Sequence, residues 1–271
     1  MVRIAEVVTV LESIAPLSLA EEWDNVGLLL GDADAEISVA LTCLTLTSDV
    51  ASEAIQAGAG LIISHHPILF RPVQQITTES WEGRLLLDLL RAGIAVYSAH
   101  TAYDSARDGI NAELAQQLKL SNVAPIRPKV ALSGSISPSP SPPIGSGRCG
   151  QLRNAIALKD FVATVGRTLK AGPLQFAGDE NAMVSKVGIA CGSAAEFLSD
   201  AKRAGCQVLL TGEARFHSYV EAREIGIALV TAGHYATERP AMERFAKQIE
   251  SACAGLKVSA SSVEQDPVKS C

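Results

Sequence analysis

The sequence predicts an α/β protein built from two similar lobes, each with a mixed sheet covered by helices. Apolar runs typical of strands alternate with segments of helical periodicity along the whole chain. A run rich in Ser, Pro and Gly interrupts this alternation at 133–147. Segments on the two sides of this run resemble each other. We therefore expect a first lobe at 1–132, a linker at 133–150 and a second lobe at 151–271.

The first lobe is expected to open with an amphipathic helix. Apolar residues recur at helical spacing from Ile4 to Ile14, and Pro16 follows. Gly58 and Gly93 stand where helices are expected to end, before apolar strands. The expected strands of this lobe lie at 26–30, 39–47, 60–64 and 94–99, and its further helices at 49–57, 77–90 and 109–118.

The second lobe repeats the alternation and closes with a helix. We expect this helix from Thr237 to Cys253, with Thr237 as its N-cap and Pro240 in its first turn. The other expected helices lie at 158–170, 194–204 and 214–224, and the expected strands at 186–191, 207–211, 227–232 and 257–262.

Two expected strands of the first lobe each resemble an expected strand of the second lobe. Residues 57–64 align with 204–211, and 93–99 align with 226–232. Each later strand leads to a histidine followed four residues on by an acid, as His100 with Asp104 and His234 with Glu238. Polar residues just past strand ends gather at one edge of an α/β sheet, so a site is expected there.

Composition narrows the classes of partner. The formal charge is −6, with 23 basic and 29 acidic residues and no basic block, which disfavours nucleic acid as a partner. No apolar run reaches the roughly 18 residues of a membrane span. The six cysteines form no CxxC pair or disulfide framework. They indicate a reducing compartment, and we expect a cytoplasmic protein.

An adjacent histidine pair is the first candidate for metal binding. His65 and His66 directly follow the expected strand 60–64, and Pro67 keeps His66 extended. Adjacent side chains diverge in an extended segment, so the pair would serve two neighbouring ions rather than one. The alternative interpretation is an ordinary surface turn.

Carboxylates complete the expected metal centre. Two ions a few ångströms apart need carboxylates that bridge or flank them, and Asp104 and Glu238 supply these. Alternatively, each acid could merely stabilise the start of a helix. With no cysteine beside these residues in the sequence, the donor set suits Zn, Fe or Mn. The predicted ligands of two divalent ions are His65, His66, Asp104, His234 and Glu238.

Further polar residues are candidates for the surroundings of this centre. His100 aligns with His234, so it could bind a metal, orient a ligand or contact substrate. His217 could do the same or be a buried histidine, and both are candidates for proton transfer. The segment Trp23-Asp24-Asn25 either lines a pocket or shapes a turn. Arg148 could contact an anionic substrate.

Six ordered motifs carry a resemblance to a known family. The motifs EEWDNVGLLLGD, LIISHHPILF, SAHTAYD, GSGRCG, VLLTGEARFH and TAGHYATE resemble those of the Ngg-interacting-factor-three-like proteins, which include type 2 GTP cyclohydrolase I homologues. The resemblance extends from about residue 4 to residue 250, and Asp266-Pro267 matches the usual ending. Thr45, Ala194 and Glu213 depart from the common pattern.

The resemblance implies a metal site between two lobes, ring-like homohexamers and the same five ligands. It also implies hydrolysis of a small molecule, either a nucleotide or another phosphate-containing compound, with GTP ring opening as the suggested activity. Two functions stay open: a metal-dependent hydrolase, or a non-enzymatic metal-binding or scaffold protein that contacts regulatory partners.

Overall fold

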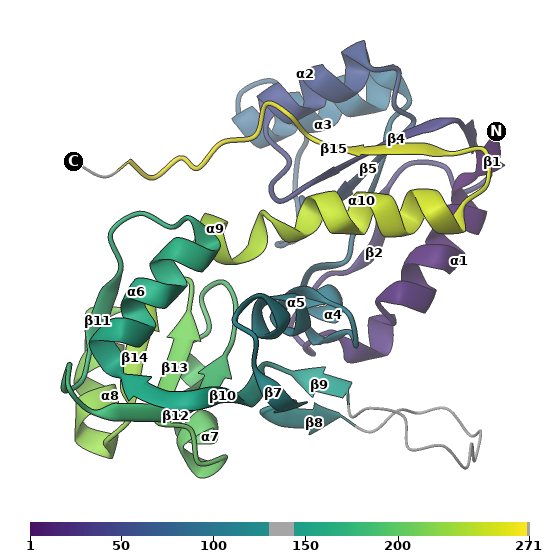
Figure 1. The fold of residues 1–271 in the computed structure, drawn as a ribbon. Coiled ribbons are helices and arrows are strands. Elements are labelled where there is room, and N and C mark those ends of the chain that lie inside the picture. Colours follow the sequence, from purple (N-terminus) through teal and green to yellow (C-terminus); the bar gives the residue numbers. More distant parts are fainter. Residues whose placement is uncertain (130–143, 270–271) are drawn as a thin grey trace. The chain divides into compact units, whose positions relative to one another are not determined.

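The computed structural model describes residues 1–129 and 144–269. The chain divides into two compact units (Figure 1). Unit 1 comprises Met1–Tyr103 and Arg239–Pro267, and unit 2 comprises Asp104–Glu238 and continues from Val268. Both units combine mixed sheets with helices, which confirms the predicted α/β class.

Unit 1 is built on a five-stranded sheet. Its strands, in spatial order, are β15 (Lys257–Ala260), β4 (Val39–Cys43), β5 (Leu61–Ser64), β6 (Ala95–Ser98) and β2 (Gly27–Leu30). The first four are parallel, and β2 closes one edge in the antiparallel sense. All residues of β5 and β6 are buried, because the sheet has helices on both faces.

Four helices cover this sheet. They are α1 (Ile4–Ile14), α2 (Ser48–Gln56), α3 (Trp81–Ala92) and α10 (Ala241–Ala252). In Figure 1, α2 and α3 lie on one face and α1 and α10 on the other. The helix expected at 77–90 starts only at Trp81, because the Ser80 hydroxyl accepts a hydrogen bond from the Gly83 amide and caps the helix there. A 3-10 turn (η1, Leu17–Leu19) and a ribbon of β1 (Val2–Arg3) and β3 (Glu36–Ile37) complete the unit.

Unit 2 is built on a six-stranded sheet. Its strands, in spatial order, are β11 (Gln175–Ala177), β14 (Ala228–Thr231), β13 (Val208–Thr211), β12 (Met183–Ile189), β10 (Arg148–Ala157) and β7 (Ser121–Ala124). The central strands β12, β13 and β14 are parallel, and the other three are antiparallel to their neighbours. The aligned sequence pairs are thus adjacent parallel strands in each unit, β5 with β6 and β13 with β14.

The helices of unit 2 include two short ones that carry predicted site residues. These are α4 (His100–Ser105), which begins in unit 1, and α9 (His234–Glu238). The others are α5 (Ile110–Gln117), α6 (Leu158–Leu169), α7 (Leu198–Arg203), which follows the 3-10 turn η2 (Ala195–Phe197), and α8 (Phe216–Ile225). A ribbon pairs β8 (Arg127–Lys129) with β9 (Ile144–Ser146).

The observed division differs from the predicted lobes at both ends. Residues 104–129 belong to unit 2, because β7 extends its sheet beside β10. Residues 239–267 belong to unit 1, because β15 pairs with β4. The part of the expected linker at 144–150 forms β9 and the start of β10, and 133–143 lies outside the described residues.

The predicted closing helix is wrong in its start and continuity. It is two helices, α9 and α10, separated by Arg239 and Pro240. Thr237 lies inside α9, where its hydroxyl donates to the carbonyl oxygen of His234 (2.9 Å), so it is not an N-cap. The proline ring prevents the helix from continuing through this point. Every helix within 1–129 and 144–269 is too short or too polar to cross a lipid bilayer.

Candidate metal centre

The histidine pair extends the parallel sheet of unit 1 past the end of β5. The His65 amide donates to the Cys43 carbonyl oxygen (2.8 Å), and the His66 amide donates to that of Leu44 (2.9 Å). The His65 carbonyl oxygen accepts from the Ser98 hydroxyl (2.7 Å) and the His100 amide (3.1 Å). Backbone bonds to both neighbouring strands therefore hold the two imidazoles in place.

Three imidazoles meet at this edge. The ring centroids of His65, His66 and His100 lie 5.2 to 5.7 Å apart. Each ring offers a nitrogen, and the three nitrogens lie within 4.8 Å of one another, close enough to share a metal ion. His100 adopts a positive φ of 25° at the start of α4, a strained conformation that turns it toward the pair.

Hydrogen bonds orient two of these rings. His66 Nδ1 lies 2.8 Å from the Thr45 hydroxyl, and His100 Nδ1 lies 2.7 Å from Asp24 Oδ1. Because Nδ1 of each ring is engaged in a hydrogen bond, Nε2 is the nitrogen suited to coordinate a metal. Burial alone would raise the pKa of Asp24, but its bonds to His100 and Thr101 lower it. Asp24 is thus the carboxylate that orients His100.

In unit 2, helix α9 places a predicted histidine and acid on one face. His234 and Glu238 are four residues apart, and His234 Nε2 lies 2.9 Å from Glu238 Oε2. On its other side, His234 Nδ1 lies 3.3 Å from Glu213 Oε1. Burial lowers the pKa of His234, but the two carboxylates outweigh burial and raise it to about 9. A metal at this histidine would therefore displace a proton.

Gly192 allows the chain to pass against the Glu238 carboxylate. Its φ is +66°, and a Cβ added there would collide with Glu238 Oε1. The Gly192 amide also bonds to the Thr237 hydroxyl (3.3 Å) inside α9. Only glycine satisfies both the backbone conformation and the space at this position.

Asp104 is held by the buried Cys191. The Cys191 thiol donates to Asp104 Oδ1 (3.1 Å). Burial raises the pKa of this thiol well above its usual value, and the charges of Asp104 and Glu238 raise it further. Cys191 is therefore a neutral donor beside the acids, and Asn111 binds its amide (2.8 Å).

A buried ion pair in unit 1 supports the His66 loop, and sequence reasoning missed it. Glu264 accepts hydrogen bonds from the amides of Leu44 (3.0 Å) and Thr45 (2.7 Å). Its carboxylate also lies 2.6 Å from Arg239 Nε, and both side chains are less than 10% exposed. Arg239 directly follows Glu238 in the chain. The Asp-Pro ending near 266 was the one sequence signal close to this contact.

Two predicted residues have other roles. Arg148 is buried, and its guanidinium donates to the carbonyl oxygens of Ser105, Ala106, Gly145 and Gly147, so it holds the backbone together instead of contacting a substrate. Its burial lowers the pKa of the guanidinium. His217 is exposed on α8, and no group of potential metal ligands among the described residues includes it.

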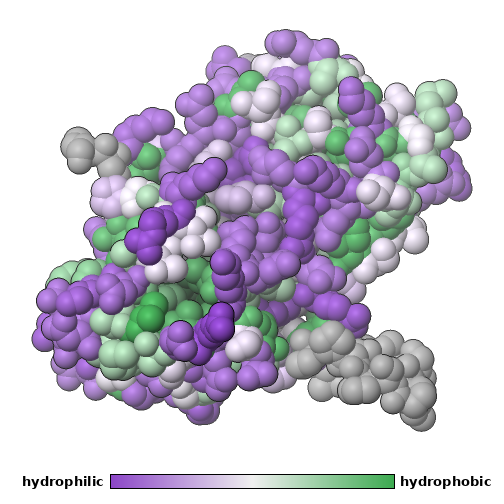
Figure 2. Space-filling model, in the orientation of Figure 1, coloured by the Kyte–Doolittle hydropathy of each residue, from purple (hydrophilic) through white to green (hydrophobic). Residues whose placement is uncertain are grey.

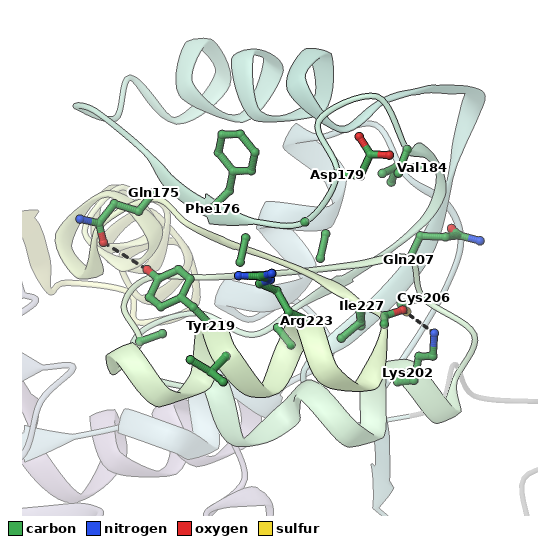
Figure 3. Close-up of a pocket in the computed structure, with 18 of the residues that line it drawn as sticks. Gln175, Phe176, Asp179, Val184, Lys202, Cys206, Gln207, Tyr219, Arg223 and Ile227 are labelled. Carbon is green, nitrogen blue, oxygen red and sulfur yellow. Dashed lines mark hydrogen bonds between the residues drawn. The ribbon is translucent and has the colours of Figure 1, made fainter.

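Unit 2 also carries a groove. Figure 3 shows this cavity of about 1220 Å³, lined by Phe176, Tyr219, Arg223 and other residues of β11 and α8. Figure 2 shows apolar side chains gathered over the same elements. No predicted metal ligand lines the groove, so the histidine and carboxylate groups are a separate feature.

The donor atoms fit first-row divalent ions. Imidazoles with carboxylates suit Zn, Fe and Mn, whereas a structural zinc site of thiolates would need several cysteines. The five cysteines among the described residues are free and buried. The structure thus supports a protein with histidine and carboxylate groups able to bind a metal ion.

Comparison with known proteins identifies the family. The model of the Duf34/NIF3 (NGG1p interacting factor 3) family matches residues 2–267. The chain belongs to the Duf34/NIF3 family. A GTP cyclohydrolase 1 type 2 homolog of Clostridium acetobutylicum is 32% identical over 252 residues, covering 92% of this chain and 90% of that protein. NIF3-like protein 1 of Drosophila melanogaster is 31% identical, covering 98% and 88%.

The family fold extends over the whole chain. A crystal structure of a Staphylococcus aureus protein superimposes with a TM-score of 0.88 at 27% identity, covering 100% of this chain and 99% of that one. The resemblance of the six sequence motifs to this family is therefore confirmed.

Proposed function

We propose that this member of the Duf34/NIF3 family binds two divalent metal ions and acts as a metal-dependent hydrolase on a small molecule. The proposed ligands are His65, His66, Asp104, His234 and Glu238. The proposal requires the histidine pair of unit 1 and the acidic group of unit 2 to share the ions. The observation that supports it best is that two of these ligands, His65 and His66, offer ring nitrogens within 4.8 Å of each other, with His100 beside them.

Bound divalent ions would lower the pKa of a water molecule and polarise the bond under attack. The chain's own residues supply orientation and proton transfer around them. Thr45 holds His66 at Nδ1, and Asp24 holds His100 in the same way. Because its Asp24 bond favours one orientation, His100 is suited to move a proton at the edge of the centre.

The substrate is expected to be a nucleotide or another phosphate-containing compound. The names of the relatives support this choice, since several are called GTP cyclohydrolase 1 type 2 homologs. Phosphate and carbonyl oxygens are ligands that divalent ions accept readily.

The family description favours a second candidate. It names an interacting factor, so the alternative is a non-enzymatic metal-binding protein that contacts regulatory partners. An enzyme should turn over substrate only when loaded with metal, whereas a scaffold should hold its ions without turnover. A homohexamer remains our proposal for the assembly, and analytical ultracentrifugation should give about six times the chain mass of 28.4 kDa.

Metal content tests the site. We expect purified protein reconstituted with Zn, Fe or Mn to bind about two ions per chain by elemental analysis, and the double variant His65→Ala/Glu238→Ala to lose most of them. His217→Ala is the matched control, because this histidine lies outside every candidate ligand group. Unchanged metal in the double variant would refute the ligand set. Screening the loaded protein against nucleotides, phosphodiesters and amides then tests the hydrolase proposal.

A further inference from the structure

Two large aromatic side chains stand exposed beside the histidine group of unit 1. Trp23 is 62% exposed and Phe70 is 47% exposed. Their ring centroids lie 5.9 Å apart in an edge-to-face arrangement. Both rings also meet the His100 ring edge-on, at 6.1 Å for Trp23 and 6.2 Å for Phe70. The ring planes are inclined by 74° to 90°, so the three rings form an edge-to-face aromatic cluster.

Polar contacts fix the Trp23 loop against His100. The neighbouring side chain, Asp24, is fully buried. Its carboxylate binds His100 Nδ1 (2.7 Å) and accepts hydrogen bonds from the Thr101 amide (3.1 Å) and hydroxyl. The Glu21 amide, on the same loop, donates to the Thr101 hydroxyl (2.9 Å). These bonds fix the residues on both sides of Trp23, whose 62% exposed indole meets the His100 ring edge-on.

The Phe70 loop is fixed to the Trp23 loop. Asn25 Nδ2 donates to the Leu69 carbonyl oxygen at 2.6 Å, across 44 residues of sequence. Single exposed aromatic residues are common on protein surfaces and need no explanation. Here two of them are tied to each other and to a candidate site residue, which lowers the entropic cost of binding a flat ligand.

We propose that the base of a nucleotide stacks on the exposed indole of Trp23, with Phe70 edge-on beside that ring and His100 at its border. This inference rests on the proposed function, because it names the substrate class of the same centre. Indole and phenyl faces stack on any nucleobase, since every base has a π-face. A base held there would bring its attached oxygen atoms to the histidine group, where the proposed metal ions would meet them.

The chain offers a clean spectroscopic test. Its two tryptophans are Trp23 and Trp81, and Trp81 begins helix α3 at 60% exposure. In Trp81→Phe, Trp23 is therefore the one tryptophan left. We expect GTP and ATP to quench its fluorescence saturably when excited at the red edge of indole absorption. Tripolyphosphate carries the phosphates without a base and should leave the fluorescence unchanged.

Calorimetry measures the contribution of the stacking surface. Trp23→Ala should weaken GTP binding by about 5- to 150-fold, which corresponds to one lost base–aromatic contact. Trp23→Phe should recover most of this loss, and tripolyphosphate affinity should be equal in all three proteins. Metal content of the same preparations should stay at the wild-type level, which tests the proposed metal centre independently.

Two results would overturn the inference. One is equal GTP affinity in Trp23→Ala and the wild type. The other is a loss of GTP and tripolyphosphate binding together with the metal, because Trp23 would then support the fold of the centre and not the base. If the chain binds no metal but GTP still quenches the Trp23 fluorescence, the proposed metal function is refuted and the proposed stacking of the base is supported.

Discussion

The ion pair between Arg239 and Glu264 should be a main support of unit 1. Its charged atoms lie 2.6 Å apart, and the side chains are 9% and 5% exposed. Removing one partner of a buried pair costs about 3–5 kcal/mol, because the other charge stays buried. In Glu264→Gln the remaining carboxylate of Glu243 still faces Arg239 at 2.6 Å. We therefore expect the lower end of this range, about 3 kcal/mol.

Urea denaturation followed by tryptophan fluorescence measures this loss, because Trp23 and Trp81 both lie in unit 1. At a slope of about 1–3 kcal/mol per M, the midpoint should fall by about 1–3 M. Glu243→Gln is the matched control, since Glu243 contacts the same arginine but is 54% exposed, and should cost at most about 1 kcal/mol. Equal losses in the two variants would refute the reasoning from burial.

Three further predictions concern other contacts. Gly192→Ala should displace Glu238 and weaken metal binding by about 10-fold or more in a competition with a chelator. Unchanged metal affinity would show that the added methyl group does not displace the Glu238 carboxylate. Arg148→Met should lower the stability of unit 2 by at least about 3 kcal/mol in thermal unfolding, because buried carbonyl oxygens lose their donor. Burial raises the pKa of Glu53, but bonds from Ser261 and its neighbours lower it overall. This carboxylate thus stabilises the C-terminal segment above its ordinary pKa of 4.5, and the contribution should disappear as the pH falls through the lowered value. After correction for the intrinsic exchange rates, the amide protection factors of that segment should fall in acid in the wild type and stay constant in Glu53→Gln.

The strands that carry the site were predictable from sequence because their signal is local. The apolar run before His65 and the glycine at position 93 set the limits of strands and helices without help from tertiary contacts. The histidine pair was expected at a strand end, and it lies directly after β5. The sequence offers only weak grounds for placing His100 beside the pair, because its position depends on a strained backbone conformation at the start of α4.

The remaining features depend on contacts between distant segments. Residues 239–267 join unit 1 because β15 pairs with β4, more than 200 residues earlier in the chain. Hydrophobic periodicity can predict a strand but not the strand with which it pairs. Glu264 and Cys191 belong to no sequence motif that signals their roles. Their contacts, with the Thr45 amide and with Asp104, join segments that are far apart in the sequence. Pro240 is also compatible with the first turn of a helix, where proline is common, so the sequence predicts one continuous helix where the structure has two.

We propose above all that imidazoles and carboxylates of this chain bind a common pair of divalent ions. The most direct test is a crystal grown with Zn, Fe or Mn and measured with anomalous scattering at the metal absorption edge. We predict two anomalous peaks per chain, with His65, His66, Asp104, His234 and Glu238 within coordination distance. Peaks bound by other residues, or no peaks at saturating metal, would contradict the account.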